Sequence, residues 1–215
     1  MKERHNSHIV LSTVAGAVFG TAVVAWPFYV SNAEKTREIS FLRAEYFAAK
    51  GLALKASDIA ERSVDLSARL ALEVTALQRE HLIDRLSTYI SHVNKKVPSS
   101  RIARALVVSA ETHGLDVLWW TAQIEQESHF NPQATGKVGE AGLAQILPST
   151  AKRLGMGWGK RFNIETNLDF GARYMAKHLR DYKSIEKAQS RYNGGGGEYS
   201  SLIRKRRGVI KNALF

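Results

Sequence analysis

The chain has 215 residues, of which 44% are hydrophobic and 24% are charged, and this composition excludes an intrinsically disordered protein. It contains no cysteine, which excludes disulfide bonds and thiolate metal sites. The formal net charge is +11, and most of the excess of Lys and Arg lies in residues 98–215. Such a surface favours anionic partners, such as nucleic acid, acidic lipid headgroups or an anionic wall polymer, and charge alone does not choose among them.

An uncharged apolar run occupies residues 9–30. As a helix it spans roughly 33 Å, enough to cross the hydrocarbon core of a bilayer. Trp26 and Tyr29 lie near its end, where interfacial aromatic residues are expected. The alternative is a cleaved signal peptide, with Ser-Asn-Ala at 31–33 as the cleavage site, but the run exceeds the roughly 7–15 apolar residues of such peptides. We therefore predict an uncleaved transmembrane anchor within residues 1–32.

Residues 33–97 have the pattern of a helical stalk. They contain no proline and one glycine, and apolar or small residues recur at spacings of three and four, with a slip near 79–81. The repeating positions are Leu52, Ala56, Ile59, Ser63, Leu66, Leu70, Val74 and Leu77. The pattern fits one continuous helix, a broken one, or a hairpin packed on the following domain. A coiled coil that joins several copies is the alternative, and a GxxxG pair at 16–20 would also allow the anchors of a homo-oligomer to pack together.

A domain boundary is expected at Pro98, because proline ends the preceding helix and Ser99 caps the next one. From here short helices alternate with glycine stops, and we see no convincing strand with a period of two. The expected helices are 99–113, 117–127, 148–154 and 166–182. The sequence therefore predicts a mainly α domain at 98–215, preceded by a stalk at 33–97 and an anchor at 1–32.

One acidic residue in this domain has an unusual position. At about 100° per residue, Glu127 falls on the same apolar stripe as Trp120 and Ile124, whereas Glu125 is expected to face solvent. Burial disfavours the carboxylate form and raises the pKa of the carboxyl group, as a general acid working near neutral pH requires. A structural acid that is paired within the core is the competing interpretation, and helical geometry does not exclude it.

The motifs around Glu127 favour the catalytic interpretation. They are Glu127-Ser128-x-Phe130-Asn131-Pro132, Gly142-Leu143-x-Gln145-Ile146-x-Pro148, Glu165-Thr166-Asn167-Leu168 and Tyr192-Asn193-Gly194. In this order and at these spacings, residues 99–200 resemble the soluble (SLT) lytic transglycosylases, relatives of goose-type lysozyme. Several motifs in register are a specific signal, although each alone would be weak. The resemblance implies a lysozyme-like α domain.

The resemblance also implies roles for particular residues. Glu127 would be the sole catalytic acid and base, and Ser128 would orient it or the sugar. Gln145 would hydrogen-bond the glycan, and Tyr192 and Asn193 would line the cleft. The family cleaves the β-1,4 bond between N-acetylmuramic acid and N-acetylglucosamine in peptidoglycan. Its glutamic acid protonates the bridging oxygen and then removes the proton from the muramic C6 hydroxyl, which closes a 1,6-anhydro ring without water or a cofactor.

Four further positions bear on this mechanism. Ordinary glycosidases need two carboxylates, and the candidates for a partner are Glu140, in a glycine-flanked loop, and Asp169. Neither lies in a motif that supports this role, so we predict a mechanism with one acid. The chain also has Ala144 where the family usually has methionine, and Arg191 where it usually has alanine. We expect a smaller glycan platform at the first position and a cation near the cleft floor at the second.

The remaining motifs point to no other activity. Gly194–Gly197 lacks the Gly-Lys-Ser/Thr of a phosphate loop and is expected to be a mobile loop at the cleft edge. The seven histidines show no ligand spacing, so no metal site is expected. The basic cluster at 204–207 is expected to be solvated or to touch an anionic lipid or polymer. Only Tyr199 lies near it, and nucleic-acid binding would need more interleaved aromatics.

We therefore predict a membrane-anchored lytic transglycosylase that opens peptidoglycan locally. Two settings fit: a bacterial inner-membrane enzyme with its domain in the periplasm, serving a secretion or conjugation machine, and a phage protein in a virion membrane, acting in entry or lysis. Basic residues flank the apolar run on both sides, so the periplasmic orientation rests on the function rather than on charge. The alternatives are a structural membrane or virion protein whose lysozyme-like domain only grips glycan, and a basic nucleic-acid-binding protein with a membrane tail.

Overall fold

A computed structural model describes residues 20–215, with side chains from residue 31 onward. The chain divides into two compact units, with the boundary after Leu70. Most of the predicted anchor, at residues 1–32, lies outside the described residues. Within residues 20–215, no helix combines the length and the apolar character needed to cross a membrane.

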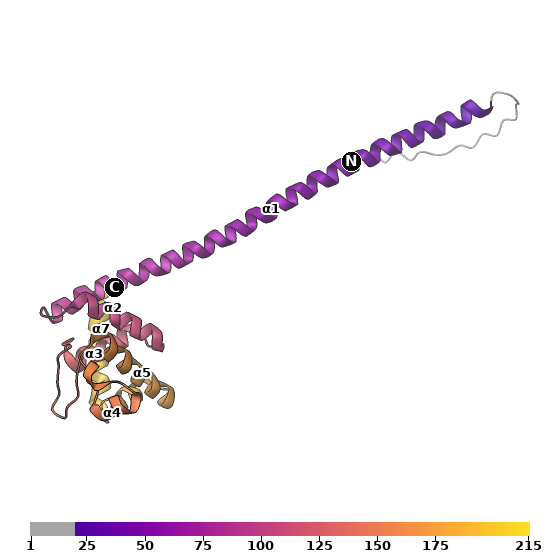
Figure 1. The fold of residues 1–215 in the computed structure, drawn as a ribbon. Helices are drawn as coiled ribbons and strands as arrows, with labels where there is room; N and C mark the ends of the chain where they lie inside the picture. The colour runs from indigo at the N-terminus through magenta and orange to yellow at the C-terminus, as the bar shows by residue number, and fades with distance from the viewer. Residues whose placement is uncertain (1–19) are drawn as a thin grey trace. The chain divides into compact units, whose positions relative to one another are not determined.

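The first long element is α1, which runs from Gly20 to Val93 (Figure 1). It continues through the slip at 79–81, so the predicted helix is unbroken there. In the first unit its side chains from residue 31 to 70 are almost all exposed. Intrahelical ion pairs, such as Arg62 with Asp58 at 3.0 Å, occur on this surface, and each contributes about 0.3–0.5 kcal/mol.

The second unit begins at Ala71 and therefore includes the last turns of α1. Ile83, Leu86 and Ile90 are fully buried in its core. Their spacing of three and four places them on one side of the helix, which packs into the unit. The compact unit thus extends further toward the N-terminus than the domain predicted at residues 98–215.

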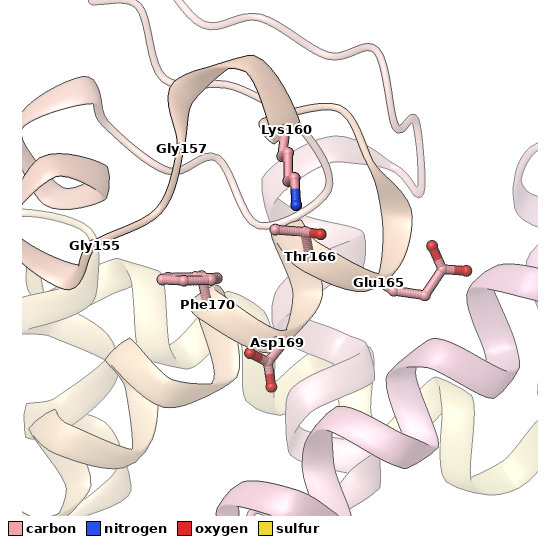
Figure 2. A pocket seen from close by; sticks show the side chains of 7 residues that line it. All are labelled: Gly155, Gly157, Lys160, Glu165, Thr166, Asp169 and Phe170. Carbon is pink, nitrogen blue, oxygen red and sulfur yellow. The ribbon is translucent and has the colours of Figure 1, made fainter.

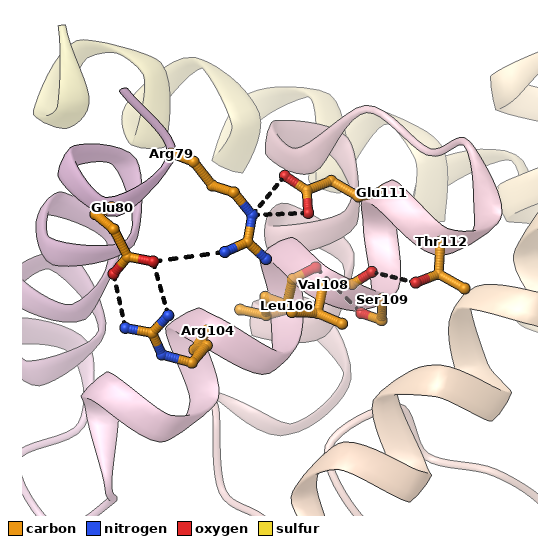
Figure 3. Close-up of polar contacts among 8 residues, drawn as sticks. All are labelled: Arg79, Glu80, Arg104, Leu106, Val108, Ser109, Glu111 and Thr112. Carbon is orange, nitrogen blue, oxygen red and sulfur yellow. Dashed lines mark hydrogen bonds and ion pairs between the residues drawn. The ribbon is translucent and has the colours of Figure 1, made fainter. Parts of the chain in front are cut away.

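Ion pairs join this end of α1 to α2, which runs from Ser99 to His113 (Figure 3). Arg79 contacts Glu111 at 2.9 Å, and Arg104 contacts Glu80 at 2.7 Å. All four side chains are partly exposed, so solvent screens these pairs and they add little to stability. The buried isoleucines and leucine therefore contribute most of the stability here, and the pairs help to set the register of the two helices.

The other helices are shorter than α1, and the sequence predicted those near 117–127, 148–154 and 166–182. The two helices that follow residue 182 were not predicted. The shorter helices are α3 (Val117–Ser128), α4 (Pro148–Leu154), the 3-10 helix η1 (Trp158–Lys160), α5 (Ile164–Tyr182), α6 (Ile185–Tyr192) and α7 (Gly197–Leu214). Gly114 and Gly155 end α2 and α4 with positive φ angles of 68° and 78°. Asp116 caps α3 by accepting a hydrogen bond from the backbone N–H of Trp119.

The prediction of a mainly α fold is confirmed. In the described part of the chain, pairing of the β type is limited to isolated bridges that Ala141 makes with Thr135 and Ile146. The helix α3 packs against α7 and α2, and α5 packs against α2 and α6. Trp120 and Ile124 of α3 lie in the core between them. This packing fixes the C-terminal end of α3, where the candidate site begins.

Candidate active site

Glu127 lies in the last turn of α3, immediately before the chain leaves the helix. His129 and Phe130 have positive φ angles of 49° and 60°, which turn the backbone sharply after Ser128. The Glu127 side chain is half-buried, and the hydroxyl of Tyr199 donates a hydrogen bond to its Oε1. The Glu127 carboxyl group therefore lies at the end of a helix, and one of its oxygens already accepts a hydrogen bond.

The electrostatics of Glu127 suit an acid that works near neutral pH. Burial, with a smaller contribution from the negative charge of Glu140, raises its pKa to about 7 against the opposing effect of the Tyr199 hydrogen bond. A carboxyl group with this pKa is populated in both protonation states near neutral pH. It can therefore give a proton and take one back, as general acid–base catalysis requires.

Tyr199 is a residue of the candidate site that the sequence did not reveal. It lies in the first turn of α7 and is buried. Burial and the Glu127 charge hold the pKa of the Tyr199 phenol far above its usual range, so it remains a donor. Gly194 and Gly195, with φ angles of 80° and 101°, form the turn before this helix. An aromatic residue just after a glycine run at a predicted cleft edge was the available signal.

Tyr192 is brought next to the same site. Its hydroxyl donates a 2.7 Å hydrogen bond to the carbonyl oxygen of Ala144, and its ring packs against Tyr174. Burial, followed by the Glu127 charge, holds the pKa of Tyr192 well above its usual range. Asn193 follows as the exposed C-cap of α6. Tyr192 therefore ties the end of α6 to the loop before α4, close to Glu127.

Ser128 and Gln145 make local contacts. The Ser128 hydroxyl donates to the carbonyl oxygen of Ile124, 3.2 Å away in the same helix. Gln145 has a φ of 44°, and its Nε2 donates to the carbonyl oxygens of Gly142 at 2.8 Å and Ala134 at 3.2 Å. In this structure the Ser128 side chain therefore binds within α3, and the Gln145 side chain holds together the loop between α3 and α4.

The Asn167 side chain of α5 also fixes that loop. Its Oδ1 accepts from the backbone N–H of Ala144 at 2.7 Å, and its Nδ2 donates to the carbonyl oxygens of Ala141 and Arg161. Gly142 has a φ of 77°, and a Cβ there would lie 2.3 Å from the Arg161 oxygen. A side chain at 142 would therefore break the contact between loop and helix. These contacts explain why the motifs carry glycine and asparagine at these positions.

The two departures from the family pattern, Ala144 and Arg191, make contacts of their own. Ala144 is fully buried, and a Cβ at Gly171 would meet its Cβ at 2.4 Å, so its side chain packs against α5 rather than forming a glycan platform. Arg191 is exposed, and its guanidinium lies over the ring of Tyr182, 5.5 Å from the ring centre. This contact therefore holds the guanidinium against the last residue of α5.

The prediction that Glu125 faces solvent was wrong. Glu125 is only 6% exposed, accepts a 2.7 Å hydrogen bond from Tyr89 of α1, and forms an ion pair with Arg206 of α7. Arg206 also donates to Gln126 at 2.7 Å. The physical reason is that α1 and α7 cover the second face of α3. A buried carboxylate is tolerated there because a cation and a hydroxyl satisfy it.

The basic cluster at 204–207 is consequently not a freely solvated run. Besides Arg206, the guanidinium of Arg207 lies 4.9 Å from the ring centre of Trp119 and 3.7 Å from Asp116. Arg204 pairs with Glu186 at 2.8 Å. Most of the cluster therefore fastens α7 to its neighbours.

The two candidate partner carboxylates, Glu140 and Asp169, are each engaged in contacts of their own. Glu140 is turned into its own loop, where its Oε2 accepts from the backbone N–H of Val138 at 3.1 Å. Asp169 lines a hollow of about 510 Å³ at the start of α5 (Figure 2) and pairs with His113 at 2.7 Å. Glu165, which lines the same hollow, pairs with Arg101. Of these three side chains, Glu140 is the one whose charge raises the pKa of Glu127.

Known proteins resemble this chain over the region that holds the site. The family model for the transglycosylase SLT domain matches residues 109–215. The membrane-bound lytic murein transglycosylase F of Desulfosudis oleivorans is 34% identical over 111 residues, which are 48% of this chain and 23% of the relative. The protein of the same name from Stutzerimonas stutzeri is 31% identical over 116 residues, 51% of this chain and 23% of the relative.

A transglycosylase of Enterobacteria phage PRD1 is 32% identical over 83 residues, which are 39% of this chain and 31% of that protein. The chain thus spans less than a third of the length of each of these curated relatives. The matched region contains Glu127, Tyr192 and Tyr199 together with the loop that Asn167 holds. Through residues 109–215, the chain therefore belongs to the transglycosylase SLT family.

Proposed function

We propose that this protein is a lytic transglycosylase that cleaves the β-1,4 bond between N-acetylmuramic acid and N-acetylglucosamine in peptidoglycan and forms a 1,6-anhydro product. The observation that carries the proposal is the state of Glu127 in an SLT domain. It is a half-buried acid with a pKa of about 7, and Tyr199 holds one of its oxygens.

The first step uses the protonated acid. Because Tyr199 donates to Oε1, we assign the proton of Glu127 to Oε2, which accepts no hydrogen bond from residues 20–215. Glu127 gives this proton to the bridging oxygen as the bond from that oxygen to the muramic C1 breaks. The N-acetylglucosamine leaves with the electron pair of the broken bond, and the bridging oxygen becomes its hydroxyl group. Positive charge develops at the muramic C1.

The second step uses the carboxylate left behind. Glu127 accepts the proton of the muramic C6 hydroxyl while the C6 oxygen attacks C1 and closes the anhydro ring. The acid is thereby restored, and no water is consumed. Tyr199 stabilises the carboxylate between the two steps, and the fixed loop of Gln145 offers its amide oxygen to a sugar hydroxyl.

One carboxylate is sufficient for this sequence of steps. A hydrolytic glycosidase needs a second carboxyl group at a defined separation, roughly 5–10 Å, to act as nucleophile or to activate water. Asp169 and Glu165 are engaged in ion pairs elsewhere. Glu140 is folded back onto its own loop, and its charge keeps the Glu127 proton in place. This arrangement supports an intramolecular attack by the C6 hydroxyl.

The test is release of soluble muropeptides from purified sacculi by the full chain. Glu127→Gln is expected to lower the rate by about 10²–10⁴-fold, because it removes the general acid and base. Glu198→Gln, an exposed glutamate one residue from Tyr199, is the matched control and should retain activity. Retained glycan binding without release by the unaltered chain would instead identify a structural, glycan-gripping protein. Equal rates for Glu127→Gln and the unaltered chain would refute the catalytic assignment.

We further propose that the protein acts from a membrane, with its anchor within residues 1–32. The uncharged run at 9–30 and the membrane-bound relatives support this placement, with the SLT domain in the periplasm. The phage relative supports a virion membrane as the other setting. Fractionation of cells that express the full chain tests the anchor. Recovery in the wash with high salt would contradict it, and recovery only with detergent would support it.

Self-association is the remaining part of the proposal. Apolar side chains along the first unit of α1, among them Leu52, Ile59 and Leu66, are more than half exposed, and a second copy could cover them. Light scattering of the full chain in detergent tests this. Replacing these three residues with serine should lower the measured mass to that of one copy. An unchanged mass would place any contact elsewhere.

A further inference from the structure

A second cavity, of about 170 Å³, lies between α3, α5 and α6, and Glu127 is not among the residues that line it. Most of its wall is apolar. The wall residues are Trp119 and Trp120 of α3, Met175 and Leu179 of α5, Ile185 of α6, and Leu115 before α3. The cavity is therefore distinct from the proposed catalytic site, although it shares α3 and α6 with it.

Two buried glutamines complete the lining of this cavity. Gln123 is 1% exposed and Gln189 is 0% exposed. The Nε2 of Gln123, and both the Nε2 and the Oε1 of Gln189, have no hydrogen-bond partner in the described part of the chain. Leaving a buried polar group without a partner costs about 1–3 kcal/mol. Such groups therefore call for a partner that enters the cavity.

The lining restricts what that partner can be. Among the described residues of the wall, Asp116 alone is an acid or a base, and it is exposed at the edge. An anion would meet Asp116 on entry and find no cation in the described wall, and a cation would find Asp116 already 3.7 Å from Arg207. A charged ligand would therefore lose its hydration without gaining a free counter-ion. An apolar cavity of about 150 Å³ is known to admit benzene, so this cavity has the size for one ring. The unpaired amide groups of Gln123 and Gln189 also require a ligand that carries a hydrogen-bond acceptor and a donor on one edge.

We propose that this cavity binds a small neutral molecule with a ring-sized apolar body and one carboxamide edge. The carbonyl oxygen of the ligand accepts from the Nε2 of Gln123 and of Gln189. The amide N–H of the ligand donates to the Oε1 of Gln189. The tryptophans and aliphatic side chains cover the ring.

The cavity is lined by residues from the same helices as the proposed catalytic site. Gln123 lies one turn before Glu127 in α3, and Gln189 lies one turn before Asn193 at the end of α6. Trp120 forms part of the cavity wall, and its ring also approaches α5 at Gly171, where a Cβ would lie 3.0 Å from it. The binding proposal does not depend on the catalytic one, because it is tested by ligand binding and not by turnover.

The experiment uses the ¹⁵N-labelled full chain with benzamide as the probe, and toluene and benzoate as comparisons of matched shape. Benzamide should shift the Trp120 indole and the Gln123 and Gln189 side-chain signals saturably, with a dissociation constant at least 10-fold below those of the other two. Gln123→Leu and Gln189→Leu should each weaken benzamide about 10-fold, the equivalent of one hydrogen bond, and leave toluene unchanged or tighter. Gln133→Leu, at an exposed position, is the matched control.

Several outcomes would overturn the proposal. Saturable binding of toluene that equals that of benzamide, with no effect of the leucine variants, would indicate a merely apolar cavity. Absence of benzamide shifts up to its solubility limit would mean that buried water satisfies the glutamines. If a leucine variant fails to fold by circular dichroism, Gln123→Met or Gln189→Met takes its place. Full benzamide affinity in folded methionine variants would refute recognition by the two carboxamides.

Discussion

Replacing Tyr199 by phenylalanine removes one hydrogen bond from the proposed catalytic carboxyl group, that of Glu127, and leaves its burial nearly unchanged. Tyr199 donates to the Oε1 of Glu127 and lowers the pKa of Glu127 against the larger effect of burial. The hydrogen bond stabilises the charged form, so its loss must raise the pKa further above about 7. The variant therefore separates the contribution of the tyrosine from that of desolvation.

The size of the effect follows from the charge on the acceptor. A hydrogen bond to a charged group contributes about 1.5–3 kcal/mol, and about 1.4 kcal/mol corresponds to one pH unit. The first step needs protonated Glu127, so activity falls as pH rises through its pKa. In Tyr199→Phe the midpoint of this fall should move up by roughly 1–2 pH units. The rate at low pH should be lower than in the unaltered chain, because the carboxylate intermediate has lost a donor.

The assay is a pH–rate profile of muropeptide release from sacculi, measured for both chains with circular dichroism at each pH. A midpoint that stays in place or moves to lower pH would refute the reasoning, because it would mean that the phenol does not stabilise the Glu127 carboxylate. A lower rate at every pH without a moved midpoint would point to a steric role for the ring.

Three further predictions concern stability and the loop. The folded-state pKa of Glu127 is raised from 4.5 to about 7, so ionisation of Glu127 destabilises the fold as pH rises through this window. In urea denaturation, the unfolding free energy of Glu127→Gln should exceed that of the unaltered chain by about 3 kcal/mol at pH 8. The two chains should be equally stable at pH 4. Arg206→Met should cost about 3 kcal/mol in the same assay, because it leaves Glu125 buried and unpaired, whereas Lys205→Met, at an exposed position, should cost little. Gly142→Ala should abolish muropeptide release while far-UV circular dichroism stays helical, because its Cβ would displace the loop beside α5; full activity would show that the loop position is unimportant.

The sequence predicted those parts of the fold that depend on local signals. Glycines and polar caps located most helix ends, because an αL residue or a side-chain cap acts within one turn. Gly114, Asp116 and Gly155 all serve as expected. Glu127 was found because its helical phase and the following chain break are both local, and the motifs around it are contiguous.

The parts that were missed depend on contacts across long sequence distances. Glu125 has the phase of a solvated residue on an isolated helix, and its partners, Tyr89 and Arg206, come from α1 and α7. Tyr199 reaches Glu127 from a helix whose start lies in a glycine run with no periodic pattern. The spacing of apolar residues in one helix does not show which other helices pack against it. The second buried face of α3 could therefore not be predicted from the residues of α3 alone.

The same limit explains the extent of the compact unit. Ile83, Leu86 and Ile90 have helical spacing, but this spacing does not say whether they contact a second copy or the following domain. Pro98 marks a real turn between α1 and α2, and a turn need not be a boundary of packing. The core is therefore completed by residues that precede the SLT match at 109–215.

The central claim is that Glu127 directs an intramolecular attack without water, and digestion of sacculi in ¹⁸O-labelled water tests it most directly. The full chain should release muropeptides that end in 1,6-anhydromuramic acid and carry no ¹⁸O at C1 by mass spectrometry. The Glu127→Gln chain should release them about 10²–10⁴-fold more slowly. Reducing-end muramic acid that carries ¹⁸O at C1 would contradict the account, because it would show that water, activated by a second group, completes the reaction.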